Sequence, residues 1–181
     1  MRKFSFLLLA TVMCFTLLSC APNPNPQDTP KIDPTLPQIE EITGGVTRGI
    51  TRETLIKERG TPTEDAEDIY YAQDKAFGES CSRTYIIATT DVVSGITTVF
   101  DLSSMSSSKE YVQFYEKIRQ AMLSAYGEPT TAWDGAAFLE AEDPDLSGQS
   151  WVCAWQFSTE RAATLQLNYV DENVVIQIIY G

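Results

Sequence analysis

Two runs of acidic residues are the most chemically suggestive feature of this 181-residue chain. Residues 143–148, Asp-Pro-Asp-Leu-Ser-Gly, begin like a calcium-binding loop. Such a loop needs a bidentate carboxylate at its twelfth position, which here is Ala154. The second run, residues 64–68, contains four carboxylates, but the acid and base of a glycosidase are usually distant in sequence and set in a cleft. We therefore expect both runs to be solvated turns, with neither a metal site nor a catalytic pair.

The chain contains no histidine. This excludes serine–histidine and cysteine–histidine nucleophile systems, histidine-containing zinc sites and the usual proton carrier at neutral pH. An enzyme would have to work with carboxylates, lysine, tyrosine or a bound metal. We therefore assign no catalytic residue, no metal and no cofactor, and do not expect an enzyme.

The first twenty residues have the three parts of an export signal. Arg2 and Lys3 precede an apolar run, residues 4–18, which is shorter than the roughly 20 residues of a spanning helix. Residues 17–20, Leu-Leu-Ser-Cys, resemble the lipobox of bacterial lipoproteins. The resemblance implies that the signal is removed before Cys20 and that the Cys20 thiol takes a diacylglycerol, so that acyl chains hold the protein on a membrane. The alternative is an ordinary secretory signal with a chance cysteine.

Cys81 and Cys153 are the two cysteines that remain after this processing. An exported protein lies in a compartment where thiols tend to oxidise. The two residues form no Cys-x-x-Cys motif, so neither a redox motif nor a zinc knuckle is indicated. We expect a disulfide between them; two buried free thiols are the alternative.

Charge and proline content restrict the partners and the organisation. The formal net charge of −12 argues against nucleic acid and anionic lipid surfaces as partners, because both are held by clustered Lys and Arg. Six of the nine prolines lie between positions 22 and 37, which indicates an extended tether. We place the signal peptide at 1–19 and the tether at 20–43.

Two segments have the signals of helices. Thr51 is a predicted N-cap for residues 52–59, and a capping box at 107–110 begins a longer amphipathic helix. Each ends at a Gly-x-Pro triplet, 60–62 and 127–129.

Strand patterns follow each helix. The predicted strands are residues 69–71, 81–89, 95–102, 131–138, 151–157, 163–169 and 174–180, with a hairpin turn at 171–173. Period-two alternation indicates an antiparallel sheet with one buried face. Tyr70, Tyr71, Trp133 and Phe138 form either an exposed contact patch or, as we expect, part of the core.

The order of helix, Gly-x-Pro and strands occurs twice, which predicts tandem repeats at 44–105 and 106–181. Residues 49–62, which run from Gly-Ile-Thr to Gly-Thr-Pro, resemble the opening of the SmpA/OmlA small outer-membrane lipoproteins. The tandem arrangement resembles β-lactamase-inhibitory-protein-like repeats. These resemblances imply a binding or assembly module of the cell envelope.

The expected fold is α+β: two tandem repeats of a helix packed on antiparallel sheet, behind a signal peptide and a Pro-rich tether. The expected function is a lipid-anchored envelope protein that binds another protein as scaffold or inhibitor. The alternative is a periplasmic carrier of a lipid or small ligand, which would need an enclosed apolar pocket. Ala21 after the lipid cysteine favours the outer membrane in a diderm, because some sorting rules use Asp there for retention in the inner membrane.

Overall fold

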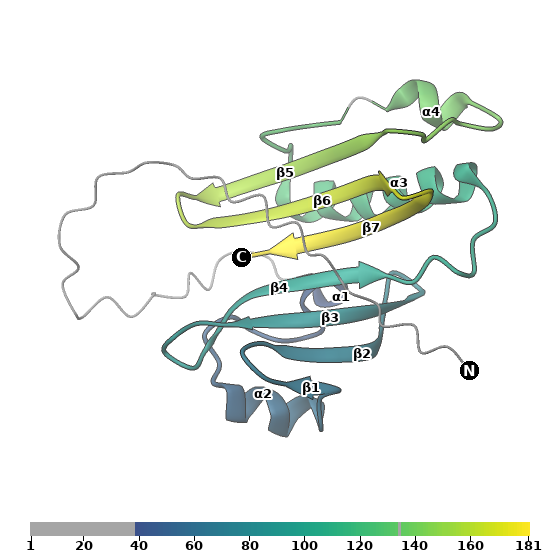
Figure 1. Ribbon diagram of the computed structural model, residues 1–181. Coiled ribbons are helices and arrows are strands. Elements are labelled where there is room, and N and C mark those ends of the chain that lie inside the picture. Colours follow the sequence, from purple (N-terminus) through teal and green to yellow (C-terminus); the bar gives the residue numbers. More distant parts are fainter. Residues whose placement is uncertain (1–38, 134) are drawn as a thin grey trace, which may run out of the picture. The chain divides into compact units, whose positions relative to one another are not determined.

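A computed structural model describes residues 39–133 and 135–181. Its elements are α1 (Glu40–Thr43), α2 (Arg52–Arg59), β1 (Glu64–Asp65), β2 (Ile69–Ala76), β3 (Glu79–Ile87), β4 (Val93–Phe100), α3 (Ser108–Tyr126), α4 (Ala136–Glu140), β5 (Ser150–Ser158), β6 (Arg161–Val170) and β7 (Asn173–Tyr180). The fold is α+β, as predicted, with one antiparallel sheet and a few helices (Figure 1). Among these residues no helix is long and apolar enough to cross a membrane.

The sheet has seven strands in the order β1-β2-β3-β4-β7-β6-β5. Two three-stranded meanders, β2–β4 and β5–β7, meet where the last strand of each pairs, with Thr97 of β4 opposite Ile179 of β7. The predicted hairpin between β6 and β7 is confirmed. Asp171 and Glu172 both have positive φ there, as a two-residue primed turn requires. The result is one continuous sheet, with one meander in each half.

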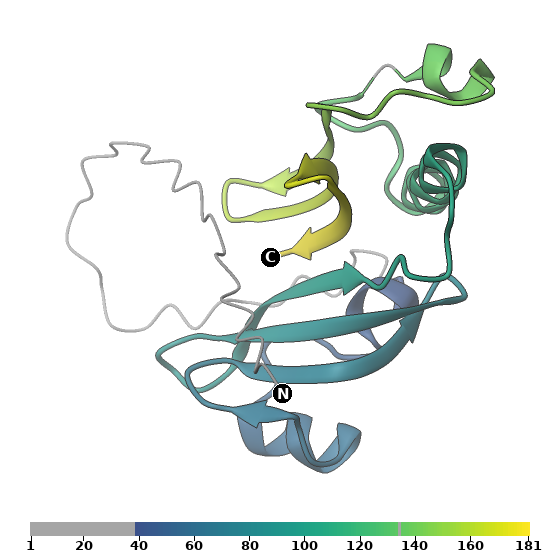
Figure 2. The same cartoon turned by 45° about the vertical axis from the view of Figure 1, so that its right-hand side comes forward.

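The helices contact the sheet through one face. Along β3 the residues that alternate inward, Cys81, Arg83 and Tyr85, are buried, and along β6 Ala163, Leu165 and Leu167 are fully buried. Inward residues of the sheet meet the helices, as in the ring contact of Phe100 on the central strand β4 with Phe114 of α3. Figures 1 and 2 show α1 and α3 on the same side of the sheet. The hydrophobic core therefore lies between the helices and this face.

The predicted helix signals are confirmed. Thr51 caps α2 by accepting the amide of Thr54, and Ser107 and Glu110 form the predicted capping box of α3. Gly60 and Gly127 follow the two helices with positive φ, 83° and 77°. These local signals fix the ends of α2 and α3.

Two predictions were wrong, for physical reasons. Residues 40–43 of the predicted tether form α1, and Ile42 is only 1% exposed, because this segment fills the core over β4. The predicted strand at 131–138 is instead a single bridge at Thr131 followed by α4. Trp133 turns back so that its ring lies where a Cβ on residue 135 would be, at 1.5 Å, and only the glycine at 135 permits this.

Candidate functional site

The candidate site is the sheet face that no helix among the described residues covers. Its positions alternate with those of the core, so the register that buries Arg83 opposite Thr98 turns Ser82 and Val99 to the other side. The outward side chains are small, β-branched or amide-bearing; they include Ser82, Thr84, Ile86, Thr97, Val99, Val175, Gln177, Ile179, Thr164, Gln166, Asn168, Val152 and Ala154. We call this surface the open face.

The open face carries almost no charge although the chain is strongly acidic. Among the outward positions of β2–β7, Lys75 at one end of β2 is the only charged residue. Two of the three exposed large hydrophobic residues of the described chain, Ile86 and Val170, also lie on it. Soluble surfaces usually carry interspersed charges, so an uncharged face of this extent makes this surface the candidate site.

Outward amides on the open face hydrogen-bond to each other across strands. Gln177 of β7 donates its side-chain amide to the Gln166 carbonyl of β6 at 2.7 Å. The Ser150 hydroxyl of β5 donates to Asn168 Oδ1 of β6 at 2.7 Å. Each amide has further donors and acceptors after this bond, so the face offers neutral hydrogen bonding together with apolar contact.

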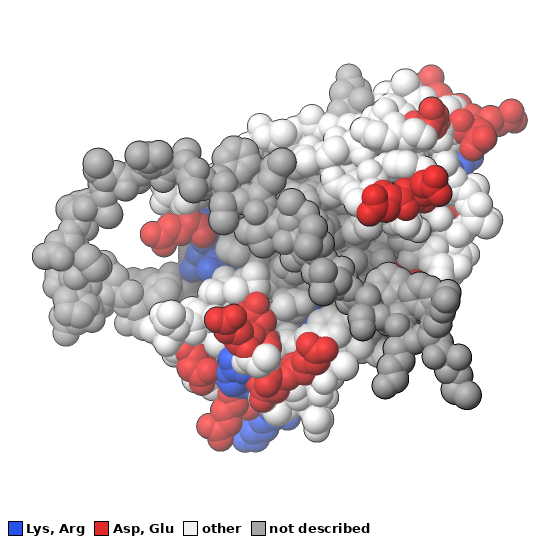
Figure 3. All heavy atoms as spheres, viewed as in Figure 1, with Lys and Arg blue, Asp and Glu red and all other residues white. Residues whose placement is uncertain are grey.

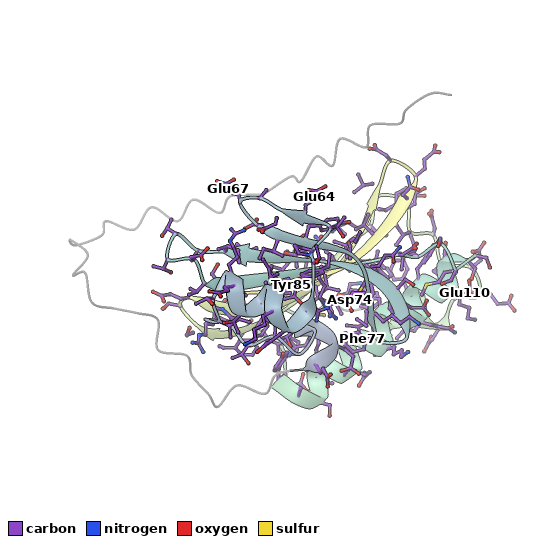
Figure 4. All side chains as sticks on the ribbon, turned by 90° about the horizontal axis from the view of Figure 1, so that it is seen from below. Glu64, Glu67, Asp74, Phe77, Tyr85 and Glu110 are labelled. Atoms are coloured by element: carbon purple, nitrogen blue, oxygen red, sulfur yellow. The ribbon has the colours of Figure 1, made fainter. Side chains whose placement is uncertain are left out.

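Carboxylates surround the open face. Exposed acidic residues lie in the turns at the strand ends, at Asp91, Glu160, Asp171 and Glu172. Figure 3 shows several separate groups of red atoms and fewer blue ones on this side of the molecule. Figure 4 shows Glu64 and Glu67, beside β1, on the opposite side of the sheet from Tyr85 and Asp74. The open face is therefore neutral at its centre and negative at its margin.

A hollow of 640 Å³ lies at one end of the open face. It spans β2, β3 and β4, and its lining includes the outward residues Tyr70, Lys75, Ser80, Ser82 and Val99, together with Asp101 just after β4. The β-bulge between Tyr71 and Asp74 bends β2 beside it. The hollow is open to solvent, and its lining includes charged groups of both signs, Lys75 and Asp101, which form no ion pair with each other.

A buried ion cluster holds the first half of the sheet in place. Arg83, 1% exposed, donates to Asp74 at 2.7 Å, and Arg59 of α2 donates to the same carboxylate. The two guanidinium groups also bind backbone carbonyls at the end of α1, that of Glu41 and that of the C-cap residue Gly44. Each charged group in this cluster is hydrogen-bonded to an opposite charge, although Arg59 Nε has no partner among the described residues, so we assign the cluster to structure.

In the second half of the sheet, an aromatic cluster lies between the helices and the sheet, as the ion cluster does in the first half. Trp133 stacks on Trp151 with ring centroids 3.9 Å apart, and Tyr115 and Phe138 contact Trp151 edge-on. A smaller hollow of 340 Å³ lies beside it, lined by residues of α3 and α4 such as Arg119 and Leu139. The Arg119 guanidinium is already paired with Glu116 at 2.7 Å, so this hollow presents no free charge.

The predicted cysteine sites have different outcomes. Cys20 lies outside the described residues. Cys81 on β3 and Cys153 on β5 are free and buried, and three strands separate β3 from β5 in the sheet. Four strand spacings are about 19 Å, whereas a disulfide needs Cα atoms within about 7 Å. The structure therefore contradicts the predicted disulfide and agrees with the alternative of two free thiols. Burial raises the pKa of the Cys81 thiol, which makes it a poor nucleophile.

The acidic runs are partly structural. Asp65 pairs with Arg52 of α2, and Asp68 accepts the amide of Ile87 at 2.9 Å, so only Glu64 and Glu67 remain as free exposed carboxylates in that run. In the 143–148 loop Asp145 accepts the amide of Ser147 in a turn. Nowhere in residues 39–133 and 135–181 do three or more His, Cys, Asp or Glu gather in a way that could hold a metal ion.

The four aromatic residues proposed as one patch do not lie together. Tyr70 and Tyr71 lie on opposite sides of β2: Tyr71 is in the core and Tyr70 lines the hollow. Trp133 and Phe138 belong to the aromatic cluster of the other half. Burial, the expected alternative, holds for Tyr71, and the other three are half-buried.

Comparison of the chain with protein-family models, with curated proteins and with solved structures gave no match. The site therefore has to be interpreted from its own residues. Sequence reasoning separated the two faces of the predicted strands at 151–157 and 163–169 but did not recognise the outward face as a surface. The signal was available: in a chain with 25 acidic residues, the outward strand positions lack charge.

Proposed function

We propose that this protein is a membrane-anchored lipoprotein of the cell envelope, outer-membrane in a diderm, that binds another protein through its open face. The observation that carries the proposal is the neutral face with an acidic margin. Such a surface fits a partner with an uncharged contact patch framed by Lys and Arg, because complementary rim charges speed encounter and fix orientation. A second copy of this chain fits poorly, since two acidic margins would meet.

The size of the open face supports this proposal. Strands β2–β7 are eight to ten residues long, and with about 4.8 Å between strands and about 3.3 Å per residue they present about 750 Å². A standard protein–protein interface buries about 800 Å² on each partner.

The carrier alternative finds less support. A carrier needs an enclosed apolar cavity, whereas the space between sheet and helices is filled by side chains such as Leu165, Ile178 and Trp155, each at most 2% exposed. The two hollows described above open to solvent, and the larger is lined mainly by polar residues. Neither would hide a lipid chain from water.

The two halves are in our proposal the products of duplication. Each is a three-stranded meander with a preceding helix that ends at a Gly-x-Pro triplet, and the halves meet strand to equivalent strand at β4 and β7. A duplicated binding unit would give a partner one continuous face.

The anchor is tested with Cys20→Ser. The intact mass of detergent-extracted wild-type protein should include acyl groups on a chain that begins at Cys20. The variant should remain unprocessed or leave the membrane. An unmodified mature N-terminus in the wild type would refute the anchor.

Partner binding is tested by placing a photo-crosslinking amino acid in the full-length protein in its native membrane. Thr97 on β4 and Thr164 on β6 report on the open face, and exposed Glu58 on α2 is the matched control. We expect one defined protein adduct from the two sheet positions, none from Glu58, and a lower yield as salt shortens the Debye length from about 10 Å at 0.1 M to about 3 Å at 1 M. No adduct from the sheet positions, or a co-purified lipid or small molecule instead, would overturn the proposal.

A further inference from the structure

We propose that the 640 Å³ hollow on the open face is the subsite that receives an arginine side chain of the protein partner. This inference rests on the proposed function and specifies what the partner must present. The hollow is the part of the open face that combines depth, hydroxyl groups and an acidic residue.

The polar groups of the hollow form a row across three strands. Lys75 of β2 is the register partner of Ser80 on β3, and the amide of Asp101 donates to the Ser80 carbonyl at 2.9 Å. Lys75 and Asp101 therefore lie two strand spacings apart, about 10 Å, with serine hydroxyls between them. Neither charge takes part in an ion pair among the described residues. Asp74 also lines the hollow beside Lys75, but Arg83 and Arg59 already pair with its carboxylate, so the unpaired charges are negative at one end and positive at the other.

The negative end suits a guanidinium group. Asp101 is ionised at neutral pH, because the amide of Ser103 donates to its Oδ1 at 3.0 Å and holds the pKa of the carboxyl below its usual value. The carboxyl is exposed, so its oxygens can accept from a ligand as well as from Ser103, and the Ser80 and Ser82 hydroxyls supply further acceptors. A planar guanidinium with five donors can bind several separated acceptors at once, whereas an ammonium binds as a point charge.

The walls suit the rest of an arginine side chain. Val99 and Tyr70 offer apolar surface to the methylene stem, and an aromatic ring attracts a cation that lies over it. Lys75 at the opposite end repels a second cation and so sets which way the side chain lies. Arginine is also among the residues that most often carry the binding energy of an interface.

The test uses amide chemical shifts of the ¹⁵N-labelled full-length protein in detergent micelles. The probes are three blocked tripeptides, Gly-Arg-Gly, Gly-Lys-Gly and the uncharged Gly-citrulline-Gly. We expect the arginine peptide to shift amides at 72–75, 80–82 and 99–101, to bind about fivefold more tightly than the lysine peptide, and the citrulline peptide to bind weakest.

Three variants make the result specific. Asp101→Asn should weaken the arginine peptide about fivefold, because it removes the one negative end. Lys75→Ala should strengthen binding of the arginine peptide about twofold, because it removes the repulsion between the Lys75 ammonium and the guanidinium. Asp171→Asn, with the same change in charge at the exposed β6–β7 turn, should leave it unchanged. Shifts outside the hollow, or equal affinity in all variants, would overturn the inference.

The photo-crosslinking experiment separates this inference from the proposed function. If Asp101→Asn lowers the adduct yield from Thr164 while Asp171→Asn does not, the subsite is used by the natural partner. If the adduct forms equally well in Asp101→Asn, the subsite is refuted although the protein still binds its partner. If no variant gives an adduct, wild type included, the proposed function itself fails.

Discussion

The two halves of the sheet have the same strand order and are covered on the same face, but they are held by different forces. In the first half, Arg59, Asp74 and Arg83 form a buried ion cluster that also binds the backbone of α1. In the second half, aromatic rings packed around Trp151 hold the helix and the sheet together. An ion cluster fixes directions through its hydrogen bonds, whereas rings contribute buried area.

The difference follows from what each half must cover. α1 has four residues and ends in carbonyl groups over the sheet, and these need buried donors. The Arg83 and Arg59 guanidinium groups supply them, and a Cβ at residue 44 would lie 2.2 Å from Arg83, so glycine is required there. α3 has nineteen residues and covers its strands mainly by packing of side chains, with one polar bond to its end, from the Trp155 indole to the Gly127 carbonyl at 2.8 Å. A short helix is thus fixed by polar bonds and a long one by packing.

The largest expected effect is in the second half. Trp151→Ala should lower the free energy of unfolding by about 4 kcal/mol, because it empties the centre of the aromatic cluster. Urea denaturation of the full chain measures it. Trp133→Ala is the control: its ring is partly exposed, so the loss should be clearly smaller. Equal losses would mean that the stacked pair, and not burial, determines stability.

A somewhat smaller effect is expected in the first half. Arg83→Met should lower the free energy of unfolding by about 3 kcal/mol. It removes one cation of the buried cluster and leaves Asp74 and the Glu41 carbonyl without that partner. Replacing Arg59, Asp74 and Arg83 together by apolar residues should recover part of that loss, since no unpaired charge remains. A triple variant less stable than the single one would show that the backbone bonds to α1 matter more than the charges.

The capping box of α3 should have a smaller, pH-dependent effect. The amides of Ser106 and Ser107 donate to Glu110 and lower its pKa from the usual 4.5. A group with a lowered folded-state pKa stabilises above 4.5 and loses this contribution as pH falls through the folded value. Glu110→Gln should therefore be less stable than wild type at pH 7 and should approach it below pH 4.5 in thermal unfolding.

Ser107→Ala provides the control for that experiment. It removes a neutral cap, so it should cost about 1 kcal/mol with little dependence on pH. If the Glu110→Gln difference also stayed constant down to low pH, the carboxylate would not be the group that titrates.

The smallest effect, none at all, is expected from reducing agent. Cys81 and Cys153 lie in different halves as free thiols, so dithiothreitol should not change the melting temperature. Alkylation in denaturant without reductant should label both. Full protection in denaturant would establish the bridge that the structure contradicts.

The sequence predicts what is encoded locally. The caps at Thr51 and Ser107, the glycines after both helices and the alternation in β5 and β6 each depend on a few adjacent residues, and all were identified. α1 was missed because prolines dominate the segment before it, and its helix depends on distant Arg83. Residues 131–138 have the composition of a strand, but the Trp133 ring stacks on Trp151 of β5, and this distant contact draws the segment out of an extended conformation.

The open face was predictable only in part, for a related reason. Alternation assigns Thr164 and Gln166 to the outward side of β6, but the order of strands decides which outward residues become neighbours. The pairing of β4 with β7 joins residues about 80 positions apart into one surface. Likewise Lys75 and Asp101 become two ends of a hollow only once β2–β4 are aligned.

The contacts of α1 determine how the fold would resist a pulling force, if the protein is anchored through its N-terminal segment as we propose. Any pull on that segment reaches the fold first at α1, whose Ile42 carbonyl accepts a hydrogen bond from Thr98 on the central strand β4, and whose Glu41 carbonyl is bound by Arg83. The load therefore enters at the middle of the sheet, where strands flank on both sides, and not at an edge where a strand could peel away. In the protein that we propose, anchored through Cys20, the Arg83 bond to the Glu41 carbonyl would keep the N-terminal end of the described fold on the sheet while a partner is bound under tension.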